Sequence, residues 1–481
     1  MGPRYFLTYQ SQTSYTLRLC DTKYQAPIDS ILKRIVETYR EEFADMSEDR
    51  NVTPSSEAIP IVMGSGSGKI LGLNMNLWRL ALVTGVAQFS MSIWGWEFSI
   101  FLEINVLLAK WQIGVALSIG MFAMILGYMA SGIMSDFIGR KNTMVISFIP
   151  MAIGLIGMWL NPTWPFIALE YALNQFGWAS VLVITAAIPA DEIAATGGSN
   201  SARTFTMVLL PAFVVDGLSP ILGGIMLDSG YSASDLHIMA AIGALAALVA
   251  AALFVRESLT SDVISKAKRG PIITVRGLGR DFWKFVLGIS GFIFFLRSAV
   301  PYLGNLTVGE WGISPAFYGY AWSFYSITSA VILYSAGTLA DRNVKLALVF
   351  ALTGNAAIVF VFSLVEGFLF LIILNTLWSF PVALWIGAEN TIVAGSVSEE
   401  KKGRALGTYR YVLSIIGLFA YSFGAYVWEL TGSLKNLYFL VGIECLLFVI
   451  ILAIVLSTIN LKRSEVITSN ENNLISPQQE T

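Results

Sequence analysis

The 481-residue sequence predicts an all-α membrane protein, with twelve transmembrane helices in two six-helix bundles and a polar N-terminal extension. Three observations indicate this fold class: few charged residues, a succession of long apolar segments, and an internal repeat between the two halves. Hydrophobic residues make up 55% of the chain and charged residues only 13%, against about 25% charged residues in soluble domains. The composition therefore indicates a polytopic membrane protein.

Composition also argues against several classes of function. The formal net charge is −2, which provides no electrostatic basis for binding nucleic acid. The single histidine, His237, and the two cysteines, Cys20 and Cys445, suggest neither a metal cluster nor a disulfide framework. The run 64–69 lacks the first glycine and the final Ser or Thr of a phosphate-binding loop. We therefore expect no enzyme, no catalytic residue, no metal and no cofactor.

Twelve apolar segments follow residue 73, each close to the ~20 residues needed to cross a bilayer. They lie near 77–102, 112–135, 143–161, 165–189, 204–227, 236–255, 285–306, 317–339, 346–365, 368–390, 407–428 and 437–458. They predict five parts of the chain: a cytoplasmic tail with a Gly/Ser linker (1–73), an N-terminal six-helix bundle (74–256), a basic cytoplasmic linker (257–284), a C-terminal six-helix bundle (285–460) and a cytoplasmic C-terminal tail (461–481).

The distribution of Lys and Arg sets the expected orientation. The loops and the C-terminal tail on one side hold eighteen of these residues, whereas the loops on the other side hold Lys110 and Lys435. Positive residues are retained on the cytoplasmic side of membrane proteins. We therefore expect a multi-pass protein of the plasma membrane with both termini in the cytoplasm.

An internal repeat relates the two halves of the chain. The segment 132–141, which reads GIMSDFIGRK, returns in a weaker form at 337–345 as GTLADRNVK. In the same way LNQFGW at 173–178 has a counterpart, LNTLW, at 374–378. The two pairs share nearly the same offset along the chain, which predicts two parallel halves of six helices each.

The loop between the second and third spans resembles the signature of the major facilitator superfamily: a glycine, an aspartate four residues later, then Gly-Arg-Lys. The resemblance covers roughly residues 75–460. It implies two six-helix bundles, a substrate cavity between them near the midplane, and transport by alternating access. The chain departs from the family pattern at Phe137, where the family has a cation, and the second copy lacks the later glycine.

Both copies of the signature are expected to form a cytoplasmic gate. Asp136, at a helix end, can pair with Arg140 or with donors at helix ends of the facing half. Such pairs hold one state and break in the other; the alternative is that these residues only anchor the inner interface. The expected gate residues are Gly132, Asp136, Gly139, Arg140, Lys141, Gly337, Asp341 and Arg342.

Two ionisable residues fall near the middle of apolar spans. A charge near the bilayer centre costs about 2.5–3.5 kcal/mol or more, so such residues are usually paired or functional. Asp216 in the fifth span and Arg297 in the seventh are therefore expected to form a charge pair between the halves. Alternatively, Arg297 binds an anionic group of the substrate.

Glu97 is the expected proton carrier. It lies in the first span, within Trp94-Gly95-Trp96-Glu97. This segment resembles the Gly-aromatic-Asp element of sugar/proton symporters in the family, in which the acid carries the proton. The alternative is a glutamate at the membrane interface that faces water.

Amide and tryptophan side chains complete the candidate substrate residues. Asn174, Gln175 and Asn375 lie at mid-span and need hydrogen-bond partners in hydrocarbon. They either bond neighbouring helices or line the cavity. Trp178 and Trp378 either stack on the substrate or act as packing and interface residues.

The combined features predict a secondary active transporter that imports a small polar metabolite, such as a sugar or an organic acid, together with protons. We expect it to act as a monomer in the lipid bilayer. A proton-driven drug or metabolite exporter is the first alternative, because the segment 217–224 resembles the Gly-Pro…Gly-Gly element of family exporters. A second alternative, of another class, is a transporter-derived membrane sensor that signals through residues 1–73.

Overall fold

The computed structural model describes residues 73–196, 201–258, 277–397 and 402–459. The chain forms two compact units, Met1–Gly64 and Ser65–Thr481, and all the described residues belong to the second. The expected N-terminal tail, most of the linker and the C-terminal tail therefore lie outside the described residues. The domain boundaries stay predictions, although the helix that follows the linker begins at Arg280, inside the range expected for the linker.

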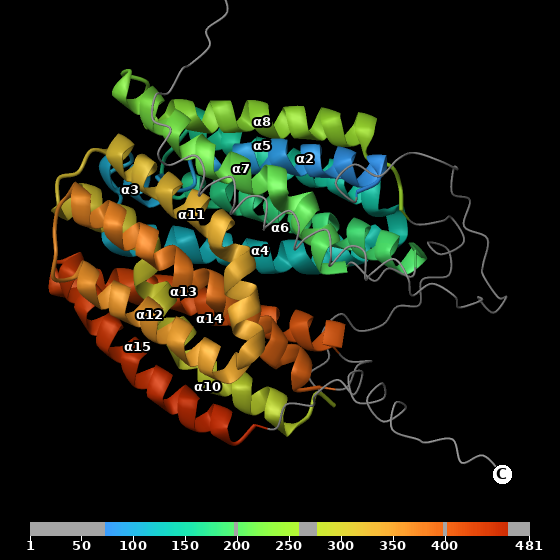
Figure 1. Ribbon diagram of the computed structural model, residues 1–481. Helices are drawn as coiled ribbons and strands as arrows, with labels where there is room; N and C mark the ends of the chain where they lie inside the picture. Colours follow the sequence, from blue (N-terminus) through green and yellow to red (C-terminus); the bar gives the residue numbers. More distant parts are fainter. Residues whose placement is uncertain (1–72, 197–200, 259–276, 398–401, 460–481) are drawn as a thin grey trace, which may run out of the picture. The chain divides into compact units, whose positions relative to one another are not determined.

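The described residues form helices and connecting turns, with no β-strand among their elements (Figure 1). The helices are α2 (Met75–Ser92), α3 (Phe98–Ile104), α4 (Lys110–Ile138), α5 (Arg140–Leu160), α6 (Phe166–Thr196), α7 (Ser201–Asp228), α8 (Ala233–Phe254), α10 (Arg280–Ala299), α11 (Pro315–Arg342), α12 (Val344–Phe362), α13 (Phe368–Gly395), α14 (Lys402–Thr431) and α15 (Leu434–Ser457). A 3-10 turn, η1 (Val300–Tyr302), and a π-helical turn, η2 (Asn305–Glu310), follow α10. The predicted all-α fold class is confirmed.

Ten of these helices are long and apolar enough to cross a membrane. Two of the twelve expected spans do not correspond to any of these ten helices. They are 77–102, which forms α2 followed by α3, and 317–339, which lies within α11. Each of the twelve expected spans thus coincides with a helix or a helix pair of the described residues. The chain is a multi-pass membrane protein.

The first span differs from the uninterrupted helix that the sequence predicts. Helix α2 ends at Ser92, and a turn precedes α3. In this turn the backbone N–H of Glu97 donates to the carbonyl of Trp94, three residues back instead of four. A Cβ at Gly95 would lie only 2.7 Å from the carbonyl oxygen of Met91. The glycine therefore allows the tight turn that places the aromatic residues around it.

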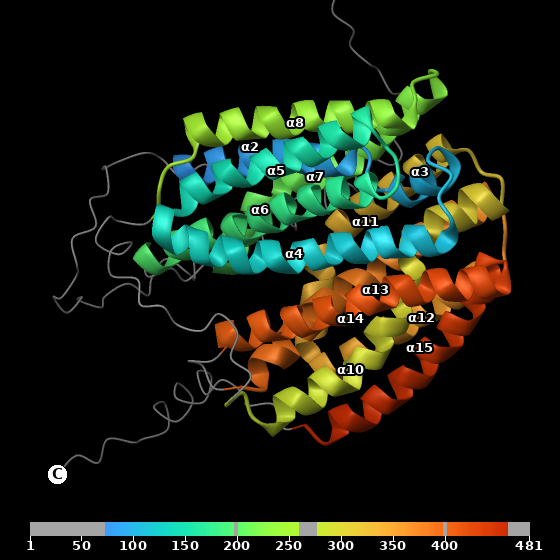
Figure 2. The same cartoon turned by 180° about the vertical axis from the view of Figure 1, so that it is seen from behind.

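The helices of each half pack extensively against one another. In the first half α6 packs against α4 and α5, and α2 packs against α7 and α8. In the second half α13 packs against α11 and α12, and α15 packs against α10 and α12. The main contacts between the halves run along two helix pairs, α4 with α14 and α7 with α11 (Figures 1 and 2).

The two halves approach each other more closely at one end of the helical bundle than at the other. We call the end with the α4–α5 junction at Gly139 the basic end, and the end with the α14–α15 junction at Gly432 the opposite end. Helices α4 and α14 approach each other toward the opposite end (Figure 2). The contacts between the halves are consequently concentrated away from the basic end.

Small residues make the α4–α14 contact close. A Cβ at Gly114 would lie 2.4 Å from the Cβ of Ala425. The Ser118 hydroxyl donates to the carbonyl of Leu418 at 2.7 Å and lies 2.8 Å from the Ser422 hydroxyl. Small side chains allow such close helix approach within a membrane.

The segment 217–224 also packs between the halves. A Cβ at Gly217 would lie 2.7 Å from the Ile327 side chain, and one at Gly224 would lie 3.0 Å from the Ala316 carbonyl oxygen. Within the described residues, the hydrogen bonds between halves all join α3, α4 or α7 to η2, α11 or α14 near the opposite end. The two halves are therefore joined at the opposite end in this structure.

Candidate functional site

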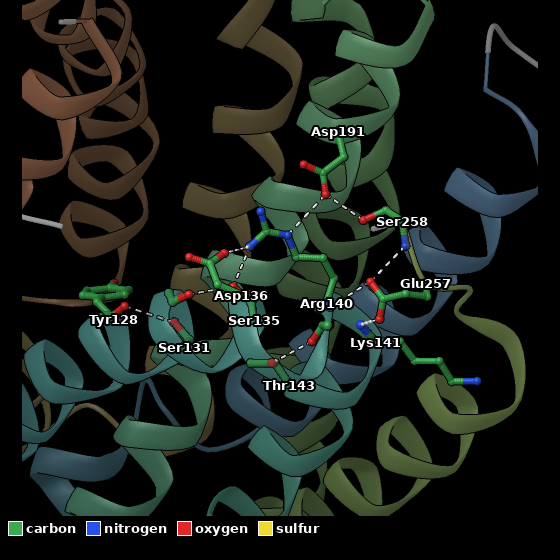
Figure 3. A network of polar contacts seen from close by, with 12 residues as sticks. Tyr128, Ser131, Ser135, Asp136, Arg140, Lys141, Thr143, Asp191, Glu257 and Ser258 are labelled. Atoms are coloured by element: carbon green, nitrogen blue, oxygen red, sulfur yellow. Dashed lines mark hydrogen bonds and ion pairs between the residues drawn. The ribbon is translucent and has the colours of Figure 1, made fainter. Parts of the chain in front are cut away.

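A carboxylate caps the start of α5 at the basic end. Glu257, three residues past α8, accepts the backbone N–H of Arg140 at 2.9 Å and that of Lys141 at 3.0 Å (Figure 3). A carboxylate is stabilising there because the free N–H groups of a helix start carry partial positive charge. Gly139 before it has a φ of 88°, and a Cβ there would lie 2.3 Å from a carboxylate oxygen of Glu257. The glycine thus meets both a backbone and a spatial requirement.

The Arg140 side chain joins three segments of the first half. Its Nε donates to Asp191 of α6 at 3.2 Å, and its Nη1 donates to the Ser135 hydroxyl of α4 at 2.5 Å. Asp136 lies 3.7 Å from the same Nη1. The Ser258 hydroxyl, past the end of α8, donates to Asp191 at 2.6 Å (Figure 3). One guanidinium therefore ties α4, α6 and the chain after α8 together.

The sequence left two expected partners for Asp136, Arg140 or donors at helix ends of the facing half. The structure shows the contact with Arg140. The Asp136 side chain is 55% exposed, and within the described residues no hydrogen bond or ion pair of this network reaches the second half. Sequence reasoning missed Asp191 and Glu257, because both are distant along the chain and only the ends of α6 and α8 bring them to Arg140. The side chains of Asp341 and Arg342 lie outside the described residues, so the second copy of the gate stays a prediction.

A cavity of about 440 Å³ lies between α4 of the first half and α10, α13 and α14 of the second. We call it the charged chamber. Its lining residues are Met121, Met124, Tyr128, Ile293, Arg297, Val382, Trp385, Ile386, Glu389, Asn390, Arg410, Leu413 and Ser414. Along α4, these residues lie further toward the basic end than the Ser118 contact that joins the halves.

Two arginines of the second half contribute positive charge to this chamber. Arg297 of α10 donates through Nη1 to the carbonyl of Leu413 at 2.7 Å. Arg410 of α14 donates through Nη2 to the Asn390 side-chain oxygen at 3.3 Å. These are the hydrogen bonds that the two arginines make within the described residues. Because a guanidinium has five N–H donors, each arginine keeps donors for a further partner.

Glu389 of α13 is the carboxylate of the charged chamber. Its residue is 8% exposed, and it interacts electrostatically with Arg410 and, more weakly, with Arg297. The Tyr409 hydroxyl and the Trp385 indole nitrogen lie next to it, and neither completes a hydrogen bond of normal geometry. If all three charged side chains are ionised, two guanidiniums and one carboxylate leave a net positive charge in the chamber.

A second cavity, of about 220 Å³, lies nearer the opposite end, and we call it the aromatic chamber. Its lining residues are Met91, Trp94, Gly95, Trp96, Phe98, Ser99, Leu117, Tyr171, Gln175, Val300, Pro301, Tyr318, Trp322 and Tyr421. Both halves contribute rings. Phe98 stacks on Tyr171 with centroids 4.3 Å apart, and Trp96 lies 5.9 Å from Tyr318 of the second half. The walls are therefore preformed aromatic surfaces.

The two chambers are neighbours along the same helices. Leu117 of the aromatic chamber lies one helical turn before Met121 of the charged chamber on α4. Arg297 lies three residues before Val300, and it interacts electrostatically with the Tyr421 hydroxyl of the aromatic chamber. A ligand of modest length can therefore contact both chambers at once.

Glu97 is buried beside the aromatic chamber. Its residue is 2% exposed, and Oε2 has no hydrogen-bond partner within the described residues. Its neighbours Trp96 and Phe98 line the chamber, whereas Glu97 is not among the lining residues. The sequence left two alternatives for Glu97, a proton carrier and an interfacial glutamate that faces water. This burial disagrees with the second.

The structure does not pair Asp216 with Arg297. Asp216 accepts hydrogen bonds from Gln88 at 2.9 Å and Ser92 at 2.5 Å, both in α2 of its own half. Arg297 instead contacts the Leu413 carbonyl. The two residues lie in different halves and each makes its hydrogen bonds within its own half, so the expected charge pair is absent from this conformation. The substrate role of Arg297 stays open.

The mid-span amides separate into two groups. Gln175 lines the aromatic chamber, where its Nε2 donates to the Tyr171 hydroxyl and its Oε1 has no partner. Asn174 and Asn375 are buried and line neither chamber. A Cβ at Gly154 of α5 would lie 2.8 Å from the Asn174 backbone nitrogen, which marks a tight helix interface. Asn174 thus lies between helices, but within the described residues neither its Oδ1 nor its Nδ2 makes a hydrogen bond, so it fits neither alternative in this structure.

The two tryptophans of the sequence repeat are buried outside both chambers. Trp378 donates through its indole N–H to Asn355 at 2.7 Å, and its ring packs near Phe362. Trp178 is 8% exposed. Both thus occupy packing positions in this structure. The aromatic lining comes instead from the turn after α2 and from α3, α6, α11 and α14, which a search for repeats does not identify.

The fold and the chambers between its halves define a membrane transporter. The family model of the major facilitator superfamily matches residues 80–309. The chain is 25% identical over 309 residues to the Enterobactin exporter EntS of Salmonella typhimurium. This alignment covers 63% of this chain and 73% of that relative. It is 30% identical over 136 residues to the Enterobactin exporter EntS of Salmonella choleraesuis, covering 28% of this chain and 33% of that relative.

Solved structures share the fold. The nucleoside transporter NupG superposes with a TM-score of 0.65 at 14% identity, covering 79% of this chain and 99% of NupG. A POT family transporter in complex with 5-aminolevulinic acid gives a TM-score of 0.63 at 12% identity, covering 80% of this chain and 96% of that protein. The chain is therefore similar to the major facilitator superfamily in sequence over residues 80–309, just under half of its length, and it shares the fold of these solved transporters. It is thus a transporter of a small-molecule substrate and not an enzyme, as the sequence predicted.

Proposed function

We propose that this chain exports a small organic molecule across the plasma membrane by alternating access, in exchange for protons. The observation that carries the proposal is the position of the two chambers, between halves that are joined at the opposite end. Relatives named as exporters favour this direction over the import that the sequence first suggested. The first alternative from the sequence is therefore preferred here.

The basic end is taken as the cytoplasmic end, because Lys and Arg are retained on that side of membranes. The charged chamber lies toward that end, and Arg410 is exposed there. A substrate from the cytoplasm can then enter between α4 and α14. The opposite rocking state would close this path, with Asp136 and its network meeting the second half as a latch.

Glu97 is the proposed proton site. It is buried in the turn that forms one wall of the aromatic chamber, and one carboxylate oxygen has no partner. A proton on Glu97 would change the charge directly behind that wall, and so couple protonation to the shape of the substrate site.

The test is counterflow and gradient-driven transport in proteoliposomes, with sugars, organic acids and amphiphilic drugs as substrates. Exchange with protons accumulates the substrate in the more acidic compartment, whereas cotransport accumulates it in the more alkaline one. Export by exchange therefore predicts accumulation on the acidic side, in either orientation of the protein. Accumulation on the alkaline side would establish the importer, and no counterflow of any compound would overturn the transport proposal.

Glu97→Gln separates coupling from binding. We expect the variant to lose the response to the pH gradient and to retain counterflow, because the amide occupies the same volume but does not titrate. Glu444→Gln in α15, outside both chambers, is the matched control and should respond as the parent does. A normal gradient response in Glu97→Gln would exclude Glu97 as the proton site.

The sensor alternative depends on residues 1–73. Deletion of 1–73 with unchanged transport would argue against an essential signalling tail. Loss of a bound partner, in a protein that transports nothing, would favour the sensor.

A further inference from the structure

We propose that the substrate is an organic monoanion that carries an aromatic ring, with its ring in the aromatic chamber and its negative group between Arg297 and Arg410. This rests on the proposed function, because it takes the two chambers as the substrate site. It adds the chemical class of the substrate and two residues, Arg410 and Glu389, that the sequence did not connect with binding.

The charge of the charged chamber selects an anion. Arg297 and Arg410 each keep N–H donors beyond the single hydrogen bond that each makes. Two guanidiniums that converge on one cavity match the paired oxygens of a carboxylate, sulfonate or phenolate-type group. A cationic substrate would be repelled by these two arginines, since like charges in one cavity repel.

Glu389 sets the number of negative charges. An ionised Glu389 carboxylate and the two guanidiniums would together carry one net positive charge, so a single negative group on the substrate would neutralise the chamber. A doubly charged group would leave an excess negative charge in a site that lies inside the membrane region, where unbalanced charge is costly. The chamber is thus matched to a monoanion.

The second chamber selects the ring. Its rings come from both halves, including Trp94, Phe98, Tyr171 and Trp322. Offset and edge-to-face contacts with such rings favour an aromatic ligand over an aliphatic one of similar size. Gln175 presents an unpartnered Oε1 to this region, which can accept a hydrogen bond from a hydroxyl or N–H group on the ring.

The spacing of the chambers sets the length of the ligand. Leu117 and Met121 are four residues apart on α4, about 6 Å along a helix that rises ~1.5 Å per residue. A two-carbon chain between a phenyl ring and a carboxylate spans such a distance. The compound 3-phenylpropanoate is therefore a suitable probe.

The experiment measures binding of four matched probes to the purified full chain by isothermal titration calorimetry. They are 3-phenylpropanoate, the neutral 3-phenylpropanamide, the non-aromatic 3-cyclohexylpropanoate and the cation 3-phenylpropylammonium. We expect the aromatic anion to bind at least about tenfold more tightly than each of the others. Equal or tighter binding of the cation or the amide would overturn the anion assignment, and equal binding of the cyclohexyl anion would overturn the aromatic one.

Variants locate the site and separate binding from folding. We expect Arg297→Gln and Arg410→Gln each to weaken 3-phenylpropanoate binding by about 10- to 100-fold, and amide binding little, since a charge-assisted contact is removed. Arg280→Gln, at the exposed start of α10 and outside both chambers, is the matched control and should leave binding unchanged. Anion binding that persists in both chamber variants would contradict the proposed site.

Glu389→Gln provides a readout of the opposite sign. Removal of an ionised carboxylate raises the positive charge, so we expect tighter binding of 3-phenylpropanoate and a larger gain for a dianion such as benzylmalonate, which carries both carboxylates at the chain end. A damaged protein would instead bind every probe more weakly. If some other compound shows counterflow while 3-phenylpropanoate neither binds nor competes, the substrate class is wrong and the transporter proposal stands.

Discussion

The two ends of the helical bundle use different chemistry to hold helices together. At the opposite end the halves meet through small residues, with Gly114 against Ala425 and Ser118 against Ser422. At the basic end the polar contacts of Arg140 stay within the first half. The difference indicates where the molecule opens: a half that separates from its neighbour must satisfy its charges internally, whereas a packed interface can consist of small uncharged surfaces.

The largest effect is expected from locking the opposite end. With Ser118→Cys and Ser422→Cys together, the hydroxyl positions that lie 2.8 Å apart become thiols within reach of a disulfide. Oxidation should abolish transport almost completely, and a reductant should restore it, because alternating access requires this contact to open. Transport is measured by counterflow, with each single cysteine variant as a control. Undiminished transport in the crosslinked protein would contradict the rocking mechanism.

A large effect is also expected at Arg140. Arg140→Gln removes the partner of Asp191, whose side chain is 23% exposed, and detaches α4 from α6. Loss of one partner of a partly buried pair should lower the free energy of unfolding by about 2–3 kcal/mol. Thermal unfolding in detergent measures this change. Arg140→Lys keeps the charge but cannot reach both Asp191 and Ser135, so it should recover only part of the stability. An unfolding temperature for Arg140→Gln equal to the parent would show that the network is not stabilising.

The smallest effect is expected from Glu257→Gln. The amide oxygen can still accept one backbone N–H at the start of α5, but the charge that favours this position is lost. We expect a decrease of about 0.5–1 kcal/mol in the free energy of unfolding. Gly139→Ala, which strains the backbone and places a Cβ against Glu257, should cost more. A larger loss in Glu257→Gln than in Gly139→Ala would mean that the cap acts by more than local contacts.

The sequence predicted some parts of the site and missed others for physical reasons. The loop 132–141 was recognised from local spacing, and its contact between Asp136 and Arg140 spans only four residues. Asp191 and Glu257 were not connected with it, because they reach Arg140 only through the packing of α6 and the end of α8. Burial at mid-span identified Arg297, but the same criterion also selected Asn174, which lies between helices.

The sequence by itself determined the membrane class, the twelve apolar segments, the repeat and the resemblance to the family, because apolar length, loop charge and short motifs are local properties of a chain. Only the tertiary structure decided which polar residues share a cavity. Glu389 and Arg410 come from different helices, and the charge that they form with Arg297 depends on how α10, α13 and α14 pack. In the proposed site the choice of substrate would follow from that packing, because selectivity depends on charges and rings brought together in space.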